Sequence, residues 1–499
     1  MVMKLNYLVK GMDILEQHGA GDLEIKGLAN DSRNVKKGYL FVAVRGTSED
    51  GHRYINHAVR NGACAVAVEV VEKLYDEVTV IRLPHTRNAL AELSARFYNY
   101  PAKNMNLIGI TGTNGKTTTS YILESILKKA GRRVGIIGSV AVRFDERSYP
   151  ASLTTPESID LMRIMAEMRD AEVTDVIAEV SSHSLDQGRT RGLMWSRALF
   201  TNLSREHLDY HSTMDAYFKA KSLLFSSLKE AHGYSVKAVI NTDDPWGREL
   251  KSMTEVPVVS YGLEDSCLVK AVNISYSPGG SGFTLVTPKG RIPIVSHLMG
   301  RINVYNILAA AAVAISLDMN LDAVAKGIQG LTYVPGRLQP VRNRRGLSLF
   351  VDYAHTPDAL EKVLQTLRPF TYERLITVFG CGGDRDRGKR PDMGRIAGRC
   401  SDVVIITSDN PRGEDPADIA RDIEEGIKDE LERVEPGRPL RERAYMIVLD
   451  RGEAIQAAVD MAQGQDIVLI AGKGHEDYQI IGETTRYFDD VEQAERAAS

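Results

Sequence analysis

At 499 residues the chain is too long for a single hydrophobic core, and its length predicts about three domains. Its hydrophobic (43%) and charged (26%) fractions are ordinary for a globular protein. The net charge of -4 lacks the basic excess of proteins that bind nucleic acid or membrane surfaces, so we expect neither kind of partner. An anionic small-molecule substrate is compatible with this net charge, because a chain whose total charge is nearly balanced can still contain local basic sites.

Cysteine usage favours a reducing compartment. The four cysteines are scattered without a C-x-x-C pair, which excludes a disulfide framework or a zinc site of the usual spacing: Cys64, Cys267, Cys381 and Cys400. The first residues lack the apolar segment of a secretory signal, and the longest apolar run, 307–317, is shorter than the ~20 residues that span a bilayer. We therefore expect a cytoplasmic protein without a membrane span.

The first two thirds of the chain alternate short apolar runs with helical patterns. Residues 1–100 contain strand-like runs at 40–44, 65–70 and 78–83 and a helical stretch near His57. A strand at 107–110, a glycine-rich turn and a helix over 116–130 follow, with Gly131 at the position of a helix-ending glycine. Further strands are predicted at 134–140, 176–180, 198–203 and 238–241. This alternation predicts an α/β fold with a mostly parallel sheet.

The pattern of apolar residues changes twice in the rest of the chain. Residues 268–297 alternate apolar and polar positions around Pro278-Gly279-Gly280 and Lys289-Gly290, which indicates an antiparallel hairpin unit. Residues 334–337 resemble a hinge, after which strands are predicted at 347–351, 375–379, 403–407 and 467–470. The i,i+4 spacing of apolar residues predicts a surface helix packed on this last sheet: Ile419, Ile423, Ile427 and Leu431.

The strongest chemical motif is the turn after residue 110. Its glycines let several backbone N–H groups face a phosphate, and the following helix N-terminus adds its positive end. Lys116 can neutralise β- and γ-phosphate oxygens, and the Thr117 hydroxyl can hold Mg²⁺. Ile110 stands where the strict phosphate-loop pattern has its first glycine, which leaves a chance match open. We predict ATP binding.

The segment Gly112-Thr113-Asn114-Gly115-Lys116-Thr117-Thr118 resembles the Mur ligase and folylpolyglutamate synthetase superfamily. Motifs similar to the family's follow in order along the chain: Glu179-Val180-Ser181-Ser182-His183, Thr201-Asn202-Leu203, His207 to His211, Asn241 to Asp244, Gly300 with Asn303 and Asn306, Pro335-Gly336-Arg337 and Asp352 to His355. The resemblance implies three domains: a UDP-substrate-binding α/β domain (1–102), a central P-loop ATPase-like domain containing the hairpin unit (103–335), and a Rossmann-like amino-acid-binding domain (336–499).

The resemblance also assigns metal ligands. Glu179 ends an apolar strand and His207 follows another; on the residues alone they could equally be a capping carboxylate and a surface histidine. The family implies that they bind Mg²⁺ together with Thr117. Lys221 resembles the lysine that Mur ligases carry as a carbamate, which would support a second Mg²⁺. It could instead be an ordinary solvated lysine, and Lys219 is the rival position.

The amino-terminal block separates members of the superfamily. Asp31-Ser32-Arg33, the segment 38–43 and Asp50-Gly51-His52 resemble the UDP-binding domain of the diaminopimelate- or lysine-adding Mur ligases, a domain that folylpolyglutamate synthetases lack. The resemblance implies uridine contacts from Asn30, Ser32, Thr47, Ser48 and Glu49. It implies contacts to the muramoyl dipeptide from Thr154, Thr155, Ser182, Gln187 and Arg189.

The last block carries the choice of amino acid. Three polar turns follow predicted strands, at 382–386, 409–412 and 472–476, although Asn-Pro also forms ordinary turns. Guanidinium groups bind carboxylates in a two-pronged way and a glutamate accepts from an ammonium, which suits the distal end of diaminopimelate better than lysine. The resemblance implies that meso-diaminopimelate contacts Arg385, Asp409, Asn410, Pro411, Arg412, Gly472 and Glu476.

Together these features predict a ligase that adds meso-diaminopimelate to UDP-N-acetylmuramoyl-L-alanyl-D-glutamate through an acyl phosphate. By resemblance, Lys116, His207 and Lys221 are catalytic, Asn306 holds adenine, and Arg337 and Asp352 bring the last domain onto the nucleotide. We expect a monomer. A folylpolyglutamate synthetase and a nucleotide-switch protein are the alternatives; the amino-terminal block opposes the first, and the lack of an Asn-Lys-x-Asp guanine motif opposes the second.

Overall fold

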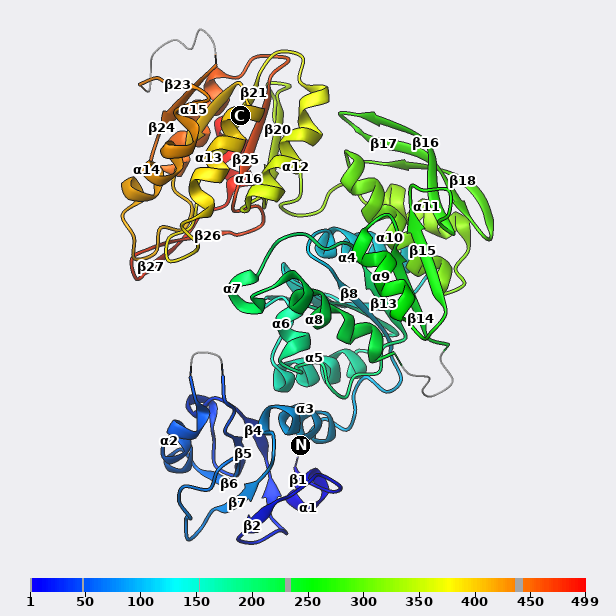
Figure 1. The fold of residues 1–499 in the computed structure, drawn as a ribbon, viewed down its shortest axis with the longest axis vertical. Helices are drawn as coiled ribbons and strands as arrows, with labels where there is room; N and C mark the ends of the chain where they lie inside the picture. Colours follow the sequence, from blue (N-terminus) through cyan, green and yellow to red (C-terminus); the bar gives the residue numbers. More distant parts are fainter. Residues whose placement is uncertain (1, 47–48, 152, 229–234, 436–442) are drawn as a thin grey trace. The chain divides into compact units, whose positions relative to one another are not determined.

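The computed structural model describes residues 2–46, 49–151, 153–228, 235–435 and 443–499 (Figure 1). These residues form two compact units. The first runs to Ala271 and includes Leu285–Ile292 and Asn306–Gly327; the second comprises Val272–Thr284, Pro293–Tyr305 and the chain from Ile328. The α/β fold class is confirmed, and most strands run parallel. The domain boundaries at 102 and 335 remain a prediction.

A five-stranded sheet organises the amino-terminal block. Its order is β2 (Glu16–His18), β7 (Thr79–Arg82), β6 (Ala63–Val68), β5 (Tyr39–Val42) and β4 (Gly27–Ala29), all parallel except β2. Successive side chains of a strand point to opposite faces, so α3 (Thr86–Phe97) covers one face and α2 (Ile55–Arg60) the other. The predicted strands and the helix near His57 are confirmed. Short elements α1 (Leu5–Leu8), β1 (Met3–Lys4) and β3 (Glu24–Ile25) complete the block.

The largest sheet has eleven strands. Its parallel part is ordered β9 (Val134–Ile137), β12 (Asp175–Glu179), β8 (Asn106–Thr111), β13 (Arg197–Phe200), β14 (Lys237–Asn241), β15 (Val258–Gly262) and β16 (Val269–Ser277). Every residue of β8, β9, β12 and β13 is buried, as expected for strands covered on both faces. The predicted parallel sheet is confirmed.

Two hairpins extend this sheet at its edges. Strands β17 (Gly280–Thr287) and β18 (Gly290–Ser296) follow β16 through two-residue turns, which confirms the predicted hairpin unit. Gly280 has φ 136°, and a Cβ there would lie 1.9 Å from the Ser296 oxygen, so the turn requires glycine. At the other edge β10 (Ala141–Phe144) pairs with the fully exposed β11 (Arg147–Pro150), a hairpin that the sequence pattern did not predict.

Helices fill the connections of this sheet. They are α4 (Lys116–Lys129), α5 (Ser158–Asp170), α6 (Ser182–Asp186), α7 (Leu208–His211), α8 (Met214–Ser226), α9 (Pro245–Met253), α10 (Arg301–Ser316) and α11 (Leu321–Gly330). The predicted helix from Lys116 is confirmed, and Gly131 ends it with φ 78°. The long apolar run lies in α10 and is buried. Within the described ranges no helix combines the length and apolarity needed to cross a bilayer.

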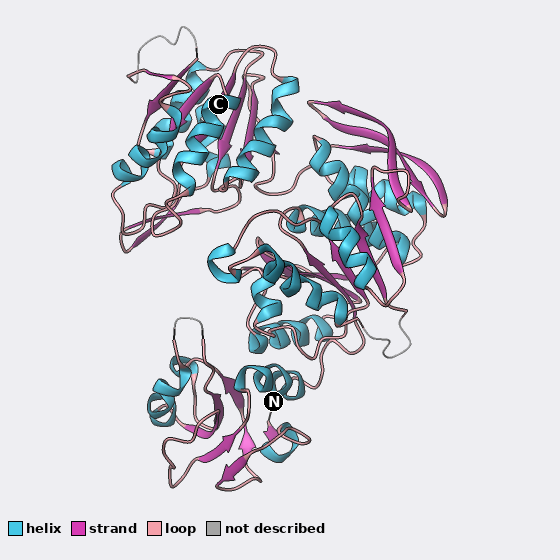
Figure 2. Ribbon diagram, in the orientation of Figure 1, coloured by secondary structure: helices cyan, strands magenta, loops and turns pink. Residues whose placement is uncertain are grey.

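A second doubly covered sheet forms the last block (Figure 2). Its order is β19 (Gln339–Pro340), β20 (Ser348–Asp352), β25 (Ile467–Ala471), β21 (Leu375–Phe379), β22 (Val403–Ile406), β24 (Ala444–Ile447) and β23 (Glu432–Arg433), parallel except for β19. One face packs on α12 (Pro357–Leu367), α13 (Lys389–Cys400) and α14 (Pro416–Ile427), the other on α15 (Arg451–Met461) and α16 (Asp490–Ala497). The Rossmann-like prediction is confirmed.

Two details of this block bear on the predictions. Ile419, Ile423 and Ile427 lie in α14 and Leu431 just beyond it, and all four are buried against the sheet as predicted. A hairpin of β26 (Tyr478–Ile481) and β27 (Thr484–Tyr487) was not predicted; it places Ile480 beside Arg412, whose N–H donates to the Ile480 carbonyl at 3.1 Å.

A buried ion pair ties the turns of this block together. The Arg451 and Asp490 side chains are both fully buried and bond through two contacts of 2.7 Å. Arg451 also donates to the carbonyls of Ala471 at 3.0 Å and Ser408 at 3.4 Å, which directly precede two of the predicted amino-acid-binding segments. The pair therefore holds the carboxyl ends of β22 and β25 in fixed positions.

Arg451→Met should lower the free energy of unfolding by about 3–5 kcal/mol, because it leaves the Asp490 carboxylate buried without its cation. Urea denaturation followed by circular dichroism measures this. The control is Arg433→Met, which removes a half-exposed arginine that pairs with Glu424 and should change the value by less than about 1 kcal/mol. Equal effects of the two substitutions would contradict the account.

Candidate active site

The phosphate loop connects β8 to α4 as predicted. Lys116 is the first residue of α4, and its Nζ donates to the carbonyls of Gly112 at 2.9 Å and Thr113 at 2.8 Å. The carbonyls of the loop therefore lie around the terminal amino group of the lysine side chain. Gly112 has φ 143°, and a Cβ there would lie 1.9 Å from Thr201 Oγ1 at the end of β13. A glycine is thus required, although the strict motif fails at Ile110.

Asn306, the predicted adenine ligand, lies against the same loop. It is buried in α10, and a Cβ on Gly115 would lie 2.4 Å from its Oδ1. Gly115 has φ 88° and precedes the first turn of α4. The structure thus brings Asn306 from far along the chain to the loop that carries Lys116.

Glu179, at the end of β12, offers oxygen ligands beside the loop. Its buried carboxylate accepts from the Thr117 and Ser139 hydroxyls, each at 3.0 Å. In the described part of the chain no group of three or more His, Cys, Asp or Glu side chains could hold a metal. Mg²⁺ in nucleotide sites needs only one or two protein oxygens besides phosphate and water, so Glu179 and Thr117 fit this ion.

Lys221 projects from α8 into the site and is 2% exposed. Its Nζ donates to the Gly112 carbonyl at 3.0 Å, the same oxygen that Lys116 uses, and lies 4.4 Å from the Tyr217 ring centroid. Burial, with the nearby Lys116 charge, holds the pKa of Lys221 well below its usual range. The rival Lys219 is exposed on another side of the helix.

His207 lies in a cluster of aromatic side chains. It has φ 56° before α7, and its ring lies edge-on to that of His183, with centroids 4.8 Å apart. Burial lowers the pKa of both histidines. His207 Nε2 is 3.8 Å from a Glu206 oxygen, and no contact between His207 and Glu179 is recorded in the described residues.

The residues predicted for the muramoyl dipeptide lie together at the ends of β12 and α6. Arg189 Nη1 donates to the Thr155 carbonyl at 3.0 Å, and its Nη2 donates to Gln187 Oε1 at 2.7 Å. Thr154 Oγ1 is 3.0 Å from Ser139 Oγ, which itself bonds Glu179. The Ser182 hydroxyl bonds His211 at 2.9 Å. This set therefore adjoins the phosphate-loop region of the same unit.

The predicted uridine residues are only partly described. Ser32 is buried in a short 3-10 helix (Ser32–Asn34) and its hydroxyl bonds His57 Nδ1 at 2.9 Å, while Asn30 is half-buried just before it. Glu49 is exposed and accepts from the Tyr54 hydroxyl. Thr47 and Ser48 lie outside the described residues.

In the second unit, Arg337 and Asp352 are both neighbours of Tyr353. The Arg337 guanidinium stacks 4.7 Å from the Tyr353 ring centroid. The Asp352 carboxylate, at the end of β20, accepts from the N–H groups of Leu338 at 2.7 Å and Ala354 at 2.8 Å; burial raises its pKa. Burial also raises the pKa of Tyr353 to about 12.

The predicted amino-acid residues converge at the carboxyl ends of β21, β22 and β25. Asn410 Nδ2 donates to Glu476 Oε2 at 3.0 Å. Gly472 has φ 115°, and a Cβ there would lie 2.8 Å from Asp409 Oδ2. In the described residues the Asp409 carboxylate forms no hydrogen bond or ion pair. The turns thus carry carboxylates able to receive an ammonium.

Two arginines lie in the turns at these strand ends. Arg412 has φ 53°, and its Nη1 donates to the Gly383 carbonyl at 2.8 Å. Its Nε and Nη2 have no hydrogen-bond partner in the described part of the chain, so one guanidinium edge remains for a carboxylate. Arg385 is exposed and donates to the Asp384 carbonyl at 3.0 Å. The intervening turns are fixed by Glu414, whose pKa of about 2 reflects its bonds to Arg390.

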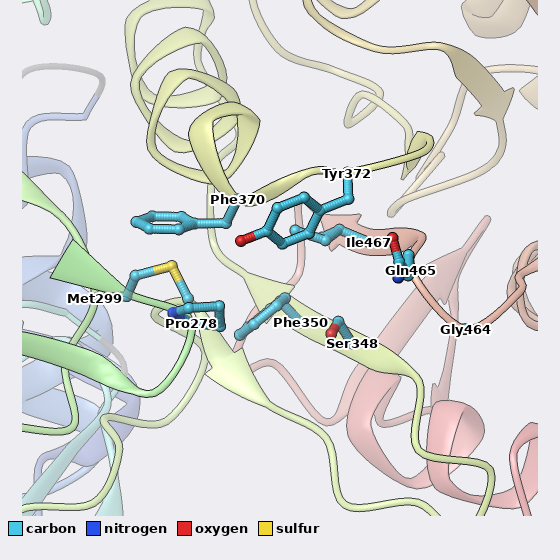
Figure 3. Close-up of a pocket in the computed structure, with 9 residues that line it drawn as sticks. All are labelled: Pro278, Met299, Ser348, Phe350, Phe370, Tyr372, Gly464, Gln465 and Ile467. Carbon is cyan, nitrogen blue, oxygen red and sulfur yellow. The ribbon is translucent and has the colours of Figure 1, made fainter.

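A cavity of about 250 Å³ lies at the other end of this sheet (Figure 3). It is bordered by Ser348 and Ile467, the first residues of β20 and β25, and by apolar side chains including Phe350 and Phe370. Ligands of open α/β sheets bind at the carboxyl ends of strands, so this cavity is not the predicted amino-acid site.

Comparisons with known proteins agree with this geometry. Three family models match in succession: "Mur ligase family, catalytic domain" at residues 24–98, "Mur ligase middle domain" at 110–314 and "Mur ligase, glutamate ligase domain" at 336–474. A UDP-N-acetylmuramoyl-L-alanyl-D-glutamate--2,6-diaminopimelate ligase of Geobacter metallireducens is 46% identical over 501 residues, covering 99% of this chain and 98% of the relative.

The chain belongs to the Mur ligase family. A ligase of the same description from Geobacillus thermodenitrificans is 44% identical, covering 98% of each chain. A solved structure titled as this diaminopimelate ligase has a TM-score of 0.70 and 32% identity, covering 100% of this chain and 99% of the other. The predicted family is thus confirmed, and this Mur ligase is an ATP-dependent ligase.

Several contacts of this Mur ligase escaped the sequence analysis. Ser139 follows β9 and bonds Glu179, but a serine after a strand carries no distinctive signal. Lys473 lies in the turn at 472–476 and Tyr353 in the motif Asp352 to His355, but no role was predicted for either residue. Both contact Glu476. Because both residues follow the end of a strand, their positions could have indicated a role in binding.

Proposed function

We propose that this Mur ligase joins meso-diaminopimelate to UDP-N-acetylmuramoyl-L-alanyl-D-glutamate in peptidoglycan precursor synthesis, forming ADP and phosphate. Relatives that cover nearly the whole chain carry this name. The observation that carries the proposal is one guanidinium edge of Arg412 without a hydrogen-bond partner in the described residues, in the turn that also holds Asp409 and Asn410, the latter bonded to Glu476; a guanidinium and carboxylates in one region suit a distal carboxylate and ammonium on one substrate.

The reaction follows from the chemistry of the acid. A D-glutamate carboxylate oxygen attacks the γ-phosphorus of ATP, the bond to the β-phosphate oxygen breaks, and ADP leaves behind an acyl phosphate. The neutral amine of diaminopimelate then attacks the acyl carbon, loses a proton, and phosphate departs as the amide forms. Activation is needed because a free carboxylate is a poor acceptor for an amine.

Lys116 and the loop N–H groups would bind the transferring phosphoryl group, whose charge spreads over its outer oxygens. Glu179 and Thr117, with His207 as the family implies, would hold Mg²⁺. When bound, the ion supplies positive charge that offsets the charge of the phosphates. The Asn306 side chain, which lies against Gly115, would contact the adenine.

Lys221 is the proposed site of carbamate formation. Only a neutral amine attacks carbon dioxide: its nitrogen forms a bond to carbon and loses a proton, which leaves a carbamate anion. The burial of Lys221 and its lowered pKa favour the neutral amine. A carbamate would also place an anion beside the Lys116 charge, in place of a second amino group that shares the Gly112 carbonyl.

The nucleotide-linked substrate would be bound in the first unit. Thr154, Thr155, Ser182, Gln187 and Arg189 surround the end of β12 next to Glu179, where the reacting carboxylate must lie. Asn30, Ser32 and the Thr47-Ser48-Glu49 turn would contact the uridine part. We further propose a monomer in the cytoplasm, where ATP is available.

Lys221→Ala should abolish activity, and short carboxylates such as formate should restore part of it by replacing the carbamate. Lys219→Ala, two positions away but exposed, is the matched control and should remain active. Phosphate release measures both variants, and NMR with isotope-labelled bicarbonate tests the modification itself. A fully active Lys221→Ala, or label on Lys219, would contradict the proposal.

Arg412→Ala should raise the KM for diaminopimelate at least tenfold, because losing a charged contact in a closed site costs about 2–5 kcal/mol. The KM values for ATP and the nucleotide substrate should change little. Arg412→Lys should not rescue binding, since an ammonium cannot make the two-pronged contact. Steady-state phosphate release with each substrate varied gives these values. An unchanged diaminopimelate KM would rule out Arg412 as the specificity residue.

A further inference from the structure

Residues proposed to bind the amino acid contact the ammonium group of a buried lysine. Lys473 follows β25 and is 0% exposed. Its Nζ lies 3.2 Å from Glu476 Oε2, 3.5 Å from Asn410 Oδ1 and 5.2 Å from the Tyr478 ring centroid. Two residues proposed to bind diaminopimelate therefore contact one cation that the substrate itself cannot reach.

The two oxygens of the Glu476 carboxylate have different partners. Oε2 accepts from both Lys473 Nζ and Asn410 Nδ2, the latter at 3.0 Å. Among the described residues, Oε1 accepts a hydrogen bond only from the Tyr353 hydroxyl, at 3.5 Å, and the side chain is 18% exposed. One oxygen is thus anchored inside the protein, and the other remains to accept from a ligand ammonium.

The turn that carries Lys473 cannot easily shift. Gly474 has φ 56°, and a Cβ there would lie 2.6 Å from the Tyr353 Cβ. A Cβ on Gly336 would lie 2.2 Å from the His475 nitrogen. The backbone segments at 336, 353 and 474 are in close contact, so the position of Glu476 depends on its side-chain partners and not on movement of the turn.

We propose that Lys473 is a positioning and specificity-determining residue for the amino-acid substrate, acting through Glu476. It holds Oε2 so that Oε1 faces the distal ammonium of diaminopimelate. This inference rests on the proposed function. It also explains why a lysine is fully buried here, since burying a charge costs free energy unless its partners compensate for it.

The charge balance around the site explains why a cation is needed. The Asp409 carboxylate, with no ion pair in the described residues, lies on the same set of strand ends as Glu476. Without Lys473 the site would hold two acidic side chains in largely buried positions before any substrate arrives. Glu476 would then lose its fixed orientation or its charge, and the ammonium of the substrate would bind less well.

The test is a double-mutant cycle of Lys473→Met and Glu476→Gln in the full-length enzyme, with diaminopimelate varied in the phosphate-release assay. Lys473→Met should raise the diaminopimelate KM at least about tenfold, as expected for losing a bond to a charged group. The KM values for ATP and the nucleotide substrate should stay within about twofold, since those sites are untouched. The double variant should bind diaminopimelate no worse than Glu476→Gln alone.

The control is Lys428→Met, which removes a lysine from a Lys–Glu pair of the same i,i+3 spacing on the surface and should alter no KM. Additive effects of the two substitutions, or a diaminopimelate KM unchanged by Lys473→Met, would overturn the inference. If Lys473→Met does not fold, the double variant decides: a KM equal to that of Glu476→Gln supports the inference, and a higher KM or a second failure to fold refutes it. A wild-type enzyme without diaminopimelate-dependent phosphate release would instead refute the proposed function, and this inference with it.

Discussion

The Gly112 carbonyl oxygen accepts from the amino groups of two lysines, Lys116 at 2.9 Å and Lys221 at 3.0 Å, and the chemistry proposed for the first unit depends on this shared acceptor. Two amino groups so close together cannot both carry a positive charge without repulsion unless anions offset it. A nucleotide triphosphate and a carbamate are such anions. The glycines at 112 and 115 let the backbone of this loop approach Thr201 and Asn306. In the proposed reaction the γ-phosphate of ATP would lie beside Lys116 and the N–H groups of this loop.

In the second unit the charged side chains that lie close together are carboxylates instead of lysines. Here the carboxylates of Asp409 and Glu476 lie in turns at the ends of parallel strands; Lys473 contacts Glu476, and Arg451, paired with Asp490, donates to the carbonyls of Ser408 and Ala471 that precede these turns. Selectivity for a substrate with both an ammonium and a carboxylate at its distal end then needs only one more cation at the rim. We propose that Arg412, with one guanidinium edge unengaged in the described residues, supplies it.

The elements with strong periodicity could be predicted from the sequence, and so could the motifs at their ends. The strand at 107–110, the helix from Lys116 and its end at Gly131 are local features, encoded by apolar runs and glycine. Strands β11 and β27 are fully exposed and contain few apolar residues, so no pair of apolar runs marked the β10–β11 and β26–β27 hairpins. Pairing across the chain was equally hidden: spacing alone could not separate Lys221 from Lys219, nor show that Lys473 meets Asn410, because burial is decided by distant segments.

The central claim is that this Mur ligase selects diaminopimelate for addition to the nucleotide-linked dipeptide. The most direct measurement is mass spectrometry of the nucleotide product after incubation with ATP, UDP-N-acetylmuramoyl-L-alanyl-D-glutamate and equal amounts of meso-diaminopimelate and lysine. The account predicts a product extended by diaminopimelate, with one ADP and one phosphate released for each bond formed. A product extended by lysine, or ATP hydrolysis without an extended product, would contradict it.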